Sequence, residues 1–192
     1  MQATASEDPR VKLKVCLAGD VAVGKTSLVR RFVCDEFDDR YLSTLGAKMM
    51  KKEIQAEMPG SRRQGHVDLI IWDIMGYRGF QELLKEAYFR GSQGILAVCD
   101  VTRPETLVGL EDWRRAIEKV AGGLPSYVLA NKVDLTEEAQ LWGEDLEAFC
   151  EGWGGSPYLL TSAKTGENVE EAFEGLTSLV LEAQLRRRAE PA

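Results

Sequence analysis

The chain has 192 residues, a net charge of −7 and 44% hydrophobic residues. This length fits one domain, and the apolar content is sufficient for one buried core. The acidic balance argues against nucleic acid as a partner, because a phosphate backbone attracts a basic surface. With His66 as the single histidine and four scattered cysteines without C-x-x-C spacing, the sequence also argues against a zinc site and against histidine-based catalysis.

The two ends of the sequence are polar. We expect a disordered tail over residues 1–10, one domain over 11–188 and a short tail over 189–192. The sequence contains no signal-peptide pattern, no apolar run of membrane-spanning length and no prenylatable cysteine at its C-terminus. We therefore expect a cytoplasmic monomer without a direct lipid anchor, which would reach a membrane only through a partner.

Apolar strand patterns alternate with amphipathic helix patterns along the chain. Strands are predicted at 11–17, 47–58, 66–73, 94–100, 126–130 and 158–160, and helices at 25–34, 80–90, 102–120, 143–150 and 169–187. The alternation predicts an α/β fold with a six-stranded, mostly parallel sheet and helices on both faces. The lysine-rich segment 47–58 is expected to be an antiparallel edge strand joined to 66–73 by an extended loop.

The first strand is followed by Gly19 and then by Gly24-Lys25-Thr26, which opens a helix. This is the pattern G-x-x-x-x-G-K-[ST] in the strand-to-helix context that phosphate binding requires. Backbone N–H groups of such a loop cradle phosphates, and the helix dipole favours an anion there. Lys25 would reach the β- and γ-phosphates, and the Thr26 hydroxyl would bind Mg²⁺. The alternative is a simple glycine-rich turn.

Two further patterns follow strands at the edge where ligands of such sheets bind. Asp73-x-x-Gly76 places a carboxylate where it can act on Mg²⁺ through water, and the Gly76 N–H can bind a γ-phosphate. In Asn131-Lys132-Val133-Asp134, the Asp134 carboxylate can accept from the adjacent N1–H and N2–H₂ donors of guanine, a pair that adenine lacks. Each could also be an ordinary turn.

The run Thr161-Ser162-Ala163-Lys164 follows the sixth strand. The Ala163 N–H can bind the guanine O6, and the Lys164 stem can pack on the base. The hydroxyl residues of this run can equally be helix caps.

Together, in this order, these motifs resemble the Ras superfamily of small GTPases over residues 11–188. Phe89, the Trp72-Asp73 pair and the run 162–173 are most similar to the Rab branch. The resemblance implies that Thr44 ligates Mg²⁺ and contacts the γ-phosphate, that Phe37 packs on the guanine and that Tyr41 closes over the phosphates. It also implies that segments 37–50 and 74–90 bind effectors, GTPase-activating proteins and exchange factors. Without the resemblance, the two aromatic residues would be assigned to the core.

The site that the resemblance implies is larger than the motifs alone. The expected catalytic residues are Lys25, Thr44 and Gly76, and the expected Mg²⁺ ligands are Thr26, Thr44 and, through water, Asp73. The residues expected to bind GTP or GDP are Asp20, Val21, Ala22, Val23, Gly24, Lys25, Thr26, Ser27, Phe37, Tyr41, Thr44, Gly76, Asn131, Lys132, Asp134, Ser162, Ala163 and Lys164.

The chain departs from the family at two positions that bear on hydrolysis. Tyr77 replaces the usual glutamine that orients the attacking water, and a phenol lacks the paired donor and acceptor of a carboxamide. Val21 stands where small residues are usual, and its branched side chain would crowd the γ-phosphate and an arginine finger. We therefore expect a GTP/GDP switch that hydrolyses slowly. The alternatives are a GTP-binding interaction protein without hydrolysis and, less compatible with Asp134, a P-loop kinase or ATPase.

Overall fold

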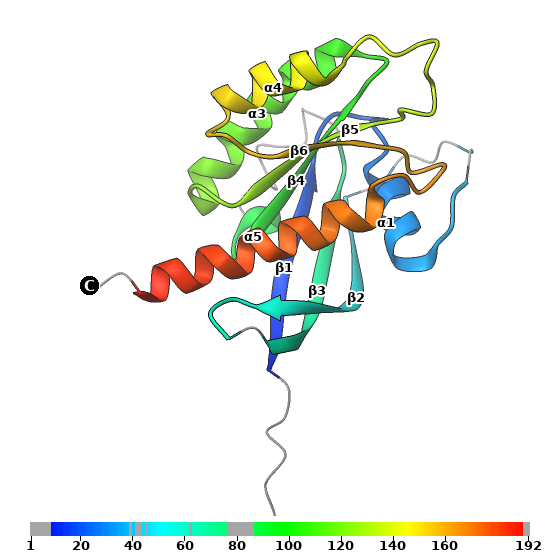
Figure 1. Ribbon diagram of the computed structural model, residues 1–192. Helices are drawn as coiled ribbons and strands as arrows, with labels where there is room; N and C mark the ends of the chain where they lie inside the picture. The colour runs from blue at the N-terminus through cyan, green and yellow to red at the C-terminus, as the bar shows by residue number, and fades with distance from the viewer. Residues whose placement is uncertain are drawn as a thin grey trace, which may run out of the picture.

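The computed structural model describes residues 9–38, 40, 44, 46–61, 63–76 and 87–189. Strands and helices alternate over most of these residues (Figure 1). The strands are β1 (Arg10–Ala18), β2 (Ala47–Met58), β3 (Arg63–Ile74), β4 (Gly94–Asp100), β5 (Ser126–Asn131) and β6 (Tyr158–Thr161). The helices are α1 (Lys25–Cys34), α3 (Pro104–Ala121), α4 (Gly143–Gly152) and α5 (Val169–Ala189).

The six strands form one sheet in the order β2-β3-β1-β4-β5-β6. β1 pairs in parallel with β3 and with β4, and β5 pairs in parallel with β4 and with β6. β2 lies at the edge and pairs with β3 in antiparallel orientation. The predicted α/β fold, with a mostly parallel sheet and one antiparallel edge strand, is confirmed.

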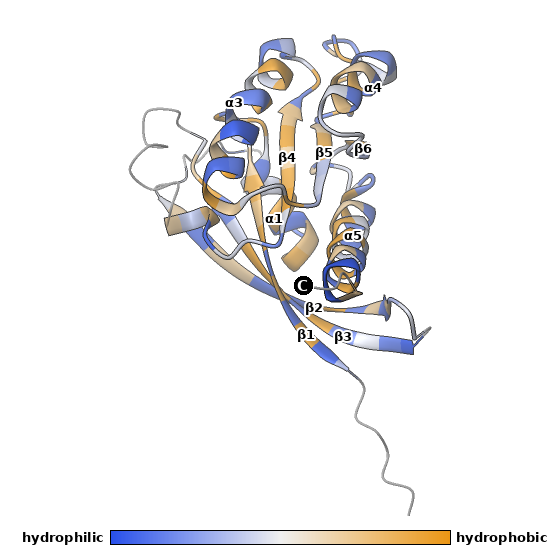
Figure 2. Cartoon of the chain, turned by 90° about the vertical axis from the view of Figure 1, so that its left-hand side faces the viewer, coloured by the Kyte–Doolittle hydropathy of each residue, from blue (hydrophilic) through white to orange (hydrophobic). Residues whose placement is uncertain are grey.

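Apolar residues cover both faces of the sheet. One cluster packs α1 and α5 against the sheet, where Phe32 and Phe173 stack with ring centroids 4.0 Å apart. The second cluster packs α3 and α4 on the opposite face around Trp113 and Leu146. In Figure 2 the apolar colour fills β4, which both layers bury, while polar residues occupy the outer sides of the helices. This two-sided burial explains the continuous apolar run of the fourth strand.

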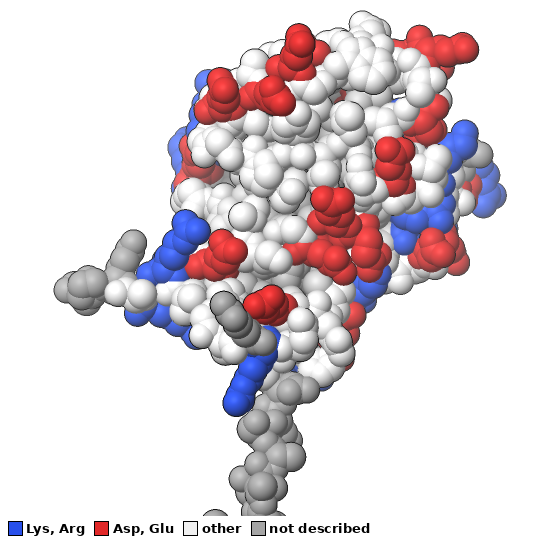
Figure 3. Space-filling model, in the orientation of Figure 1, with Lys and Arg blue, Asp and Glu red and all other residues white. Residues whose placement is uncertain are grey.

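The two ends of α5 carry opposite charges. Glu170 and Glu171 lie in its first turn, and Arg186, Arg187 and Arg188 lie in its last turn, so that both groups complement the helix dipole. On the face drawn in Figure 3, acidic side chains lie in the middle and along the top, and basic ones lie toward the left-hand and right-hand edges. Within the described residues, no helix has the length and apolarity needed to cross a bilayer.

The hairpin formed by β2 and β3 differs from the prediction. β3 begins at Arg63, three residues earlier than the predicted start at 66, and only 59–62 connect the strands. The expectation of an extended loop is therefore wrong, because the additional residues lengthen the strands. The polar residues Arg63, Gln64 and Gly65 pair with Met58, Glu57 and Ala56. Of the predicted helix at 80–90, residues 87–89 are helical and 80–86 lie outside the described residues.

Candidate nucleotide site

A cavity of about 1100 Å³ opens at the carboxyl edge of the sheet. Its walls come from the loops that follow β1, β3, β5 and β6 and from the segment between α1 and β2. A smaller cavity of about 540 Å³ lies between α3 and the C-terminal part of α5 and contains none of the predicted site residues. The larger cavity lies where parallel sheets bind their ligands, at the ends of neighbouring strands.

Most of the predicted site residues meet at this cavity. Its lining includes Val21, Ala22, Gly24, Lys25, Thr26, Ser27, Phe37, Thr44, Asp73, Gly76, Asn131, Lys132, Asp134, Ala163 and Lys164. Three others stand behind the wall and support it: Asp20, Val23 and Ser162. The predicted contacts of Tyr41 and Tyr77 lie outside the described residues.

The loop between β1 and α1 wraps tightly because two glycines have no side chain. Gly19 has φ of 141° and Gly24 has φ of 100°, and a Cβ would overlap the Val98 carbonyl oxygen at the first and Asn131 Nδ2 at the second. Between them, Ala22 has φ of 62°, a left-handed conformation that costs an L-residue about 1–2 kcal/mol. The sequence motif predicted the glycines, but not this strained alanine.

Lys25 is the buried cation of the loop and is 6% exposed. Its ammonium donates to the carbonyl oxygens of Gly19 at 2.8 Å and Asp20 at 2.7 Å. Burial lowers the pKa of Lys25 to about 8, although Asp73 and Asp20 act in the opposite direction. A phosphate group at the cavity would offset this desolvation with direct charge pairing.

Side-chain oxygens of three residues gather beside Lys25. The Thr26 hydroxyl donates to Asp73 Oδ2 at 2.6 Å and lies 2.9 Å from the Thr44 hydroxyl. Asp73 Oδ1 is buried and has no hydrogen-bond partner among the described residues. Burial raises the pKa of Asp73, with Thr26, Lys25 and Lys48 opposing the shift. A hard cation that takes oxygen ligands, such as Mg²⁺, fits this group.

The opposite end of the cavity is held together by Asn131, which is 1% exposed. Its Nδ2 donates to the Val23 carbonyl at 2.9 Å and connects the end of β5 to the first loop. Its Oδ1 accepts from the Thr161 hydroxyl at 3.3 Å and from the Ala163 N–H at 3.2 Å. An acceptor atom of a base would therefore share the Ala163 N–H with Asn131.

Asp134 stands at the cavity with one carboxylate oxygen already bound. Its Oδ1 accepts from the Ser162 hydroxyl at 2.6 Å, which fixes the orientation of the carboxylate. Lys132 lines the same wall with its stem, and its ammonium pairs with Asp100 Oδ2 at 2.6 Å. The arrangement suits a flat heterocycle with two adjacent N–H donors, stacked beside lysine stems.

Four residues that the sequence did not single out complete the site. Arg31 donates to the Ala163 and Lys164 carbonyls at 2.9 and 2.8 Å and so positions the loop after β6. Asp100, Arg103 and Trp113 connect β4 and α3 to the first loop. Asp100 offered a signal, since it ends an apolar strand at the binding edge. Arg31 and Arg103 offered none, because both look like solvated helix or turn residues.

The fold and the cavity define an α/β P-loop nucleotide-binding protein. Comparison with known proteins then gives the family: the model of the Ras family matches residues 14–182. The chain is 33% identical over 178 residues to Ras-related protein Rab-32C of Dictyostelium discoideum, covering 92% of this chain and 76% of that protein. It is 36% identical over 177 residues to Ras-related protein Rab7 of Drosophila melanogaster, covering 90% and 82%.

A third relative carries an activity in its name. Ypt/Rab-type GTPase ypt7 of Pyricularia oryzae is 34% identical over 175 residues, covering 88% of this chain and 82% of that protein. The chain therefore belongs to the Ras family and to its Rab branch, and is a GTP-binding small GTPase. The resemblance stated from the motifs is confirmed.

Proposed function

We propose that this GTPase binds guanine nucleotide in the cavity described above, with the base at Asp134 and the phosphates at Lys25. The observation that supports this most strongly is that one cavity holds both groups, together with the oxygen cluster of Thr26, Thr44 and Asp73. Asp134 selects guanine because its carboxylate can accept from two adjacent donors. Lys25 and the N-terminal end of α1 bind the anionic phosphates.

We further propose that Mg²⁺ would be held by Thr26 and Thr44, with Asp73 acting through water. When bound, Mg²⁺ supplies charge neutralisation for the phosphate oxygens. No cluster of three His, Cys, Asp or Glu side chains occurs among the described residues. The ion would therefore depend on phosphate oxygens and water for its remaining ligands, which couples metal binding to nucleotide binding.

The switch would follow from loss of the γ-phosphate. Thr44 and Gly76 line the same cavity on the two loops that would contact this phosphate, and the Thr44 hydroxyl lies 2.9 Å from that of Thr26. With GTP, both loops would be held through these contacts. Hydrolysis would release them and so alter segments 37–50 and 74–90, to which partners would bind.

We also propose that hydrolysis is slow. Val21 lines the cavity and is 38% exposed, and a Cβ at Gly76 would lie only 2.6 Å from the Val21 nitrogen. The Val21 backbone therefore lies against Gly76, where the γ-phosphate would bind, and the branched side chain of Val21 belongs to the same cavity wall. Together with a phenol at Tyr77 in place of a carboxamide, it would hinder the placement of the attacking water.

Partner binding is proposed at segments 37–50 and 74–90 and at the sheet face between them. Met49 is 61% exposed and pairs across the β2–β3 ladder with Trp72. The Trp72 ring lies 6.0 Å from the ring of Tyr88. Rab-branch proteins act through effectors and regulators. A partner bound to this apolar surface would lie beside the nucleotide loops and could therefore distinguish the bound nucleotide.

The first experiment identifies the nucleotide released when freshly purified protein is denatured, and then compares GTP and ATP as competitors of bound GDP. Release of guanine nucleotide and competition by GTP alone are expected. Competition by ATP would favour the kinase or ATPase alternative and contradict the assignment of Asp134.

The second experiment is single-turnover hydrolysis with Mg²⁺ and no partner. The rate is expected below the value of about 4 × 10⁻⁴ s⁻¹ typical of unassisted Ras-type enzymes, and Tyr77→Gln and Val21→Gly should each raise it. Val108→Ala, at a valine that is 72% exposed on α3, is the control and should leave the rate unchanged. A wild-type rate at or above the typical value would refute slow hydrolysis. No turnover even in Tyr77→Gln would favour the interaction protein without hydrolysis.

A further inference from the structure

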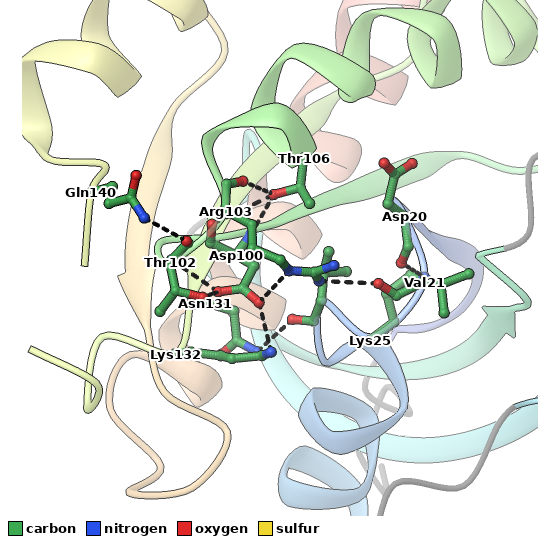
Figure 4. A network of polar contacts seen from close by, with 11 residues as sticks. Asp20, Val21, Lys25, Asp100, Thr102, Arg103, Thr106, Asn131, Lys132 and Gln140 are labelled. Carbon is green, nitrogen blue, oxygen red and sulfur yellow. Dashed lines mark hydrogen bonds and ion pairs between the residues drawn. The ribbon is translucent and has the colours of Figure 1, made fainter. Parts of the chain in front are cut away.

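A buried carboxylate at the end of β4 joins three loops of the nucleotide site. Asp100 is 0% exposed, and its Oδ1 accepts from the Thr102 N–H at 3.0 Å and from the Thr102 hydroxyl at 2.7 Å. Its Oδ2 pairs with Lys132 Nζ at 2.6 Å and accepts from Arg103 Nε at 3.1 Å (Figure 4). Burial alone would raise the pKa of Asp100, but Lys132 and Thr102 outweigh it and the pKa is lowered. Asp100 is therefore a charged anchor.

Arg103 extends from this anchor to the phosphate-binding loop. Its Nη2 donates to the Val21 carbonyl oxygen at 3.1 Å, and Figure 4 shows the guanidinium lying between Asp100 and Val21. The preceding residue on this loop is held from the adjoining helix α3, since Trp113 Nε1 donates to Asp20 Oδ1 at 3.3 Å. The two residues Asp20 and Val21 are thus both bound by α3 and the residue that precedes it.

The contact with Val21 determines the direction of a neighbouring N–H. The Val21 carbonyl and the Ala22 N–H belong to one planar trans peptide, in which they point in opposite directions. Because the Val21 carbonyl points toward Arg103, the Ala22 N–H points away from Arg103. Ala22 lines the cavity and has the left-handed φ of 62° that such a turn of the backbone needs.

An arginine suits this position better than a lysine. The planar guanidinium directs Nε to the carboxylate and Nη2 to the carbonyl at a fixed angle, so both bonds form without loss of further side-chain freedom. A lysine could reach one of these acceptors as a point charge, but would not fix the peptide in the same way.

We propose that Arg103, anchored on Asp100, is a positioning residue for phosphate binding: it holds the Val21–Ala22 peptide so that the Ala22 N–H faces the phosphates. Through Asp100 it also connects this peptide to Lys132 on the base-binding loop. The inference rests on the proposed nucleotide site and adds to it a residue that touches neither base nor phosphate. Its loss leaves Lys25, Thr26 and Asp134 in place but frees the strained peptide.

The test measures release of a fluorescent GDP in the presence of Mg²⁺ from the wild type and from Arg103→Ala, Arg103→Lys and Arg115→Ala. Release is expected to accelerate about tenfold in Arg103→Ala, as for loss of one charge-assisted hydrogen bond, and less in Arg103→Lys. Arg115 is the matched control, because it also lies on α3 and pairs with Asp112 and Glu111 on the helix surface. Its replacement should leave the release rate unchanged.

A second readout separates positioning from general stability. In the GDP complex, amide exchange at Ala22 should accelerate in Arg103→Ala, while exchange in the strands of the sheet stays as in the wild type. Equal GDP release from the wild type and Arg103→Ala overturns the inference, as does a uniform loss of protection in both Arg103 variants. If wild-type protein does not bind GDP at all, the proposed function fails instead, and the two failures are distinguishable.

Discussion

The two ends of the cavity are built differently. At the end proposed to bind the base, called the base end below, Asn131, Ser162 and Asp134 bind one another or nearby backbone, so the protein alone fixes their orientation. At the phosphate end, Ala22 is strained, burial lowers the pKa of Lys25 to about 8, and Asp73 Oδ1 has no partner among the described residues.

This difference implies that the base end determines which nucleotide binds and that the phosphate end determines how tightly it binds. A preformed base end can reject the wrong base at little cost, because its donors and acceptors are already aimed. The phosphate end carries desolvation and strain that an anion and a divalent cation would relieve. We therefore expect changes at the base end to alter which nucleotide binds, and changes at the phosphate end to alter how long it stays.

The largest effect is expected for Asp134→Asn. Guanine would lose two hydrogen bonds to a charged acceptor, each contributing about 1.5–3 kcal/mol, so GDP affinity should fall by about 10³-fold. Equilibrium binding of fluorescent GDP measures this, with Glu138→Gln in the same loop as the control. If GDP affinity falls by less than tenfold, the base does not lie at Asp134.

The next largest effect is expected at the proposed Mg²⁺ site of Thr26, Thr44 and Asp73. Thr26→Ala should accelerate GDP release in Mg²⁺ by about 10–100-fold, because a hydroxyl ligand and its bond to Asp73 are lost. With a chelator, wild type and variant should release GDP at similar rates. Thr26→Ser keeps the hydroxyl and should behave as the wild type. An equal effect of Thr26→Ala with and without Mg²⁺ would show that Thr26 does not act through the ion.

A smaller effect concerns strain in the phosphate-binding loop. Ala22→Gly should raise the free energy of unfolding by up to about 1 kcal/mol, since glycine adopts the left-handed conformation without the penalty of a Cβ. Chemical denaturation of nucleotide-free protein measures the change. Ala116→Gly, inside α3, should act in the opposite direction because glycine weakens a helix interior. Destabilisation by both substitutions would argue against strain at Ala22.

The smallest effect concerns the pH dependence of stability, because two carboxylates on β3 have pKa values shifted in opposite directions. Asp68 pairs with Arg10 at 2.8 Å and Lys51 at 2.9 Å, which lower its pKa to about 2 from 3.8, whereas burial raises the pKa of Asp73. A lowered pKa means that Asp68 stabilises the fold above about pH 4 and that this contribution is lost between about pH 4 and 2.

Asp68→Asn should therefore weaken the loss of stability over that acid range, as measured by thermal unfolding against pH. The change should be modest, because Arg10 and Lys51 are about half exposed and solvent screens their charges. Glu57→Gln on β2 is the control. An unchanged acid limb in Asp68→Asn would show that these ion pairs do not contribute to stability.

Sequence patterns predicted most of this arrangement where short-range signals are strong. α1 has the predicted bounds, Lys25–Cys34, because the glycine loop fixes its start and Asp35 ends it in a left-handed conformation. The turn-like residues 63–65 were misassigned, since their strand conformation comes from pairing with β2 rather than from local preference. Propensity alone does not contain this pairing.

At the site, the sequence predicted most of the residues that line the cavity but not all of those that position them. Trp113 is a core residue at 1% exposure, yet its indole N–H also binds Asp20. Arg103 lies 82 residues from Val21 along the chain, and only the packing of α3 beside the first loop brings them together. Such supporting contacts carry no periodicity or spacing by which a sequence could reveal them.

The long β2–β3 hairpin has a consequence for how this protein can vary in length. Thr44 lies three residues before β2, and Asp73 is the penultimate residue of β3, so the pairing of Ala47 with Ile74 sets how the two loops with the proposed metal ligands face each other. An unmatched insertion within either strand would shift this alignment by about 3.3 Å and reverse the side-chain faces. Insertions around Gly60, or equal additions to both strands at the distal end, leave it unchanged. Insertions can thus lengthen the hairpin at its distal end while the relative positions of Thr44 and Asp73, the proposed metal ligands at the other end, are preserved.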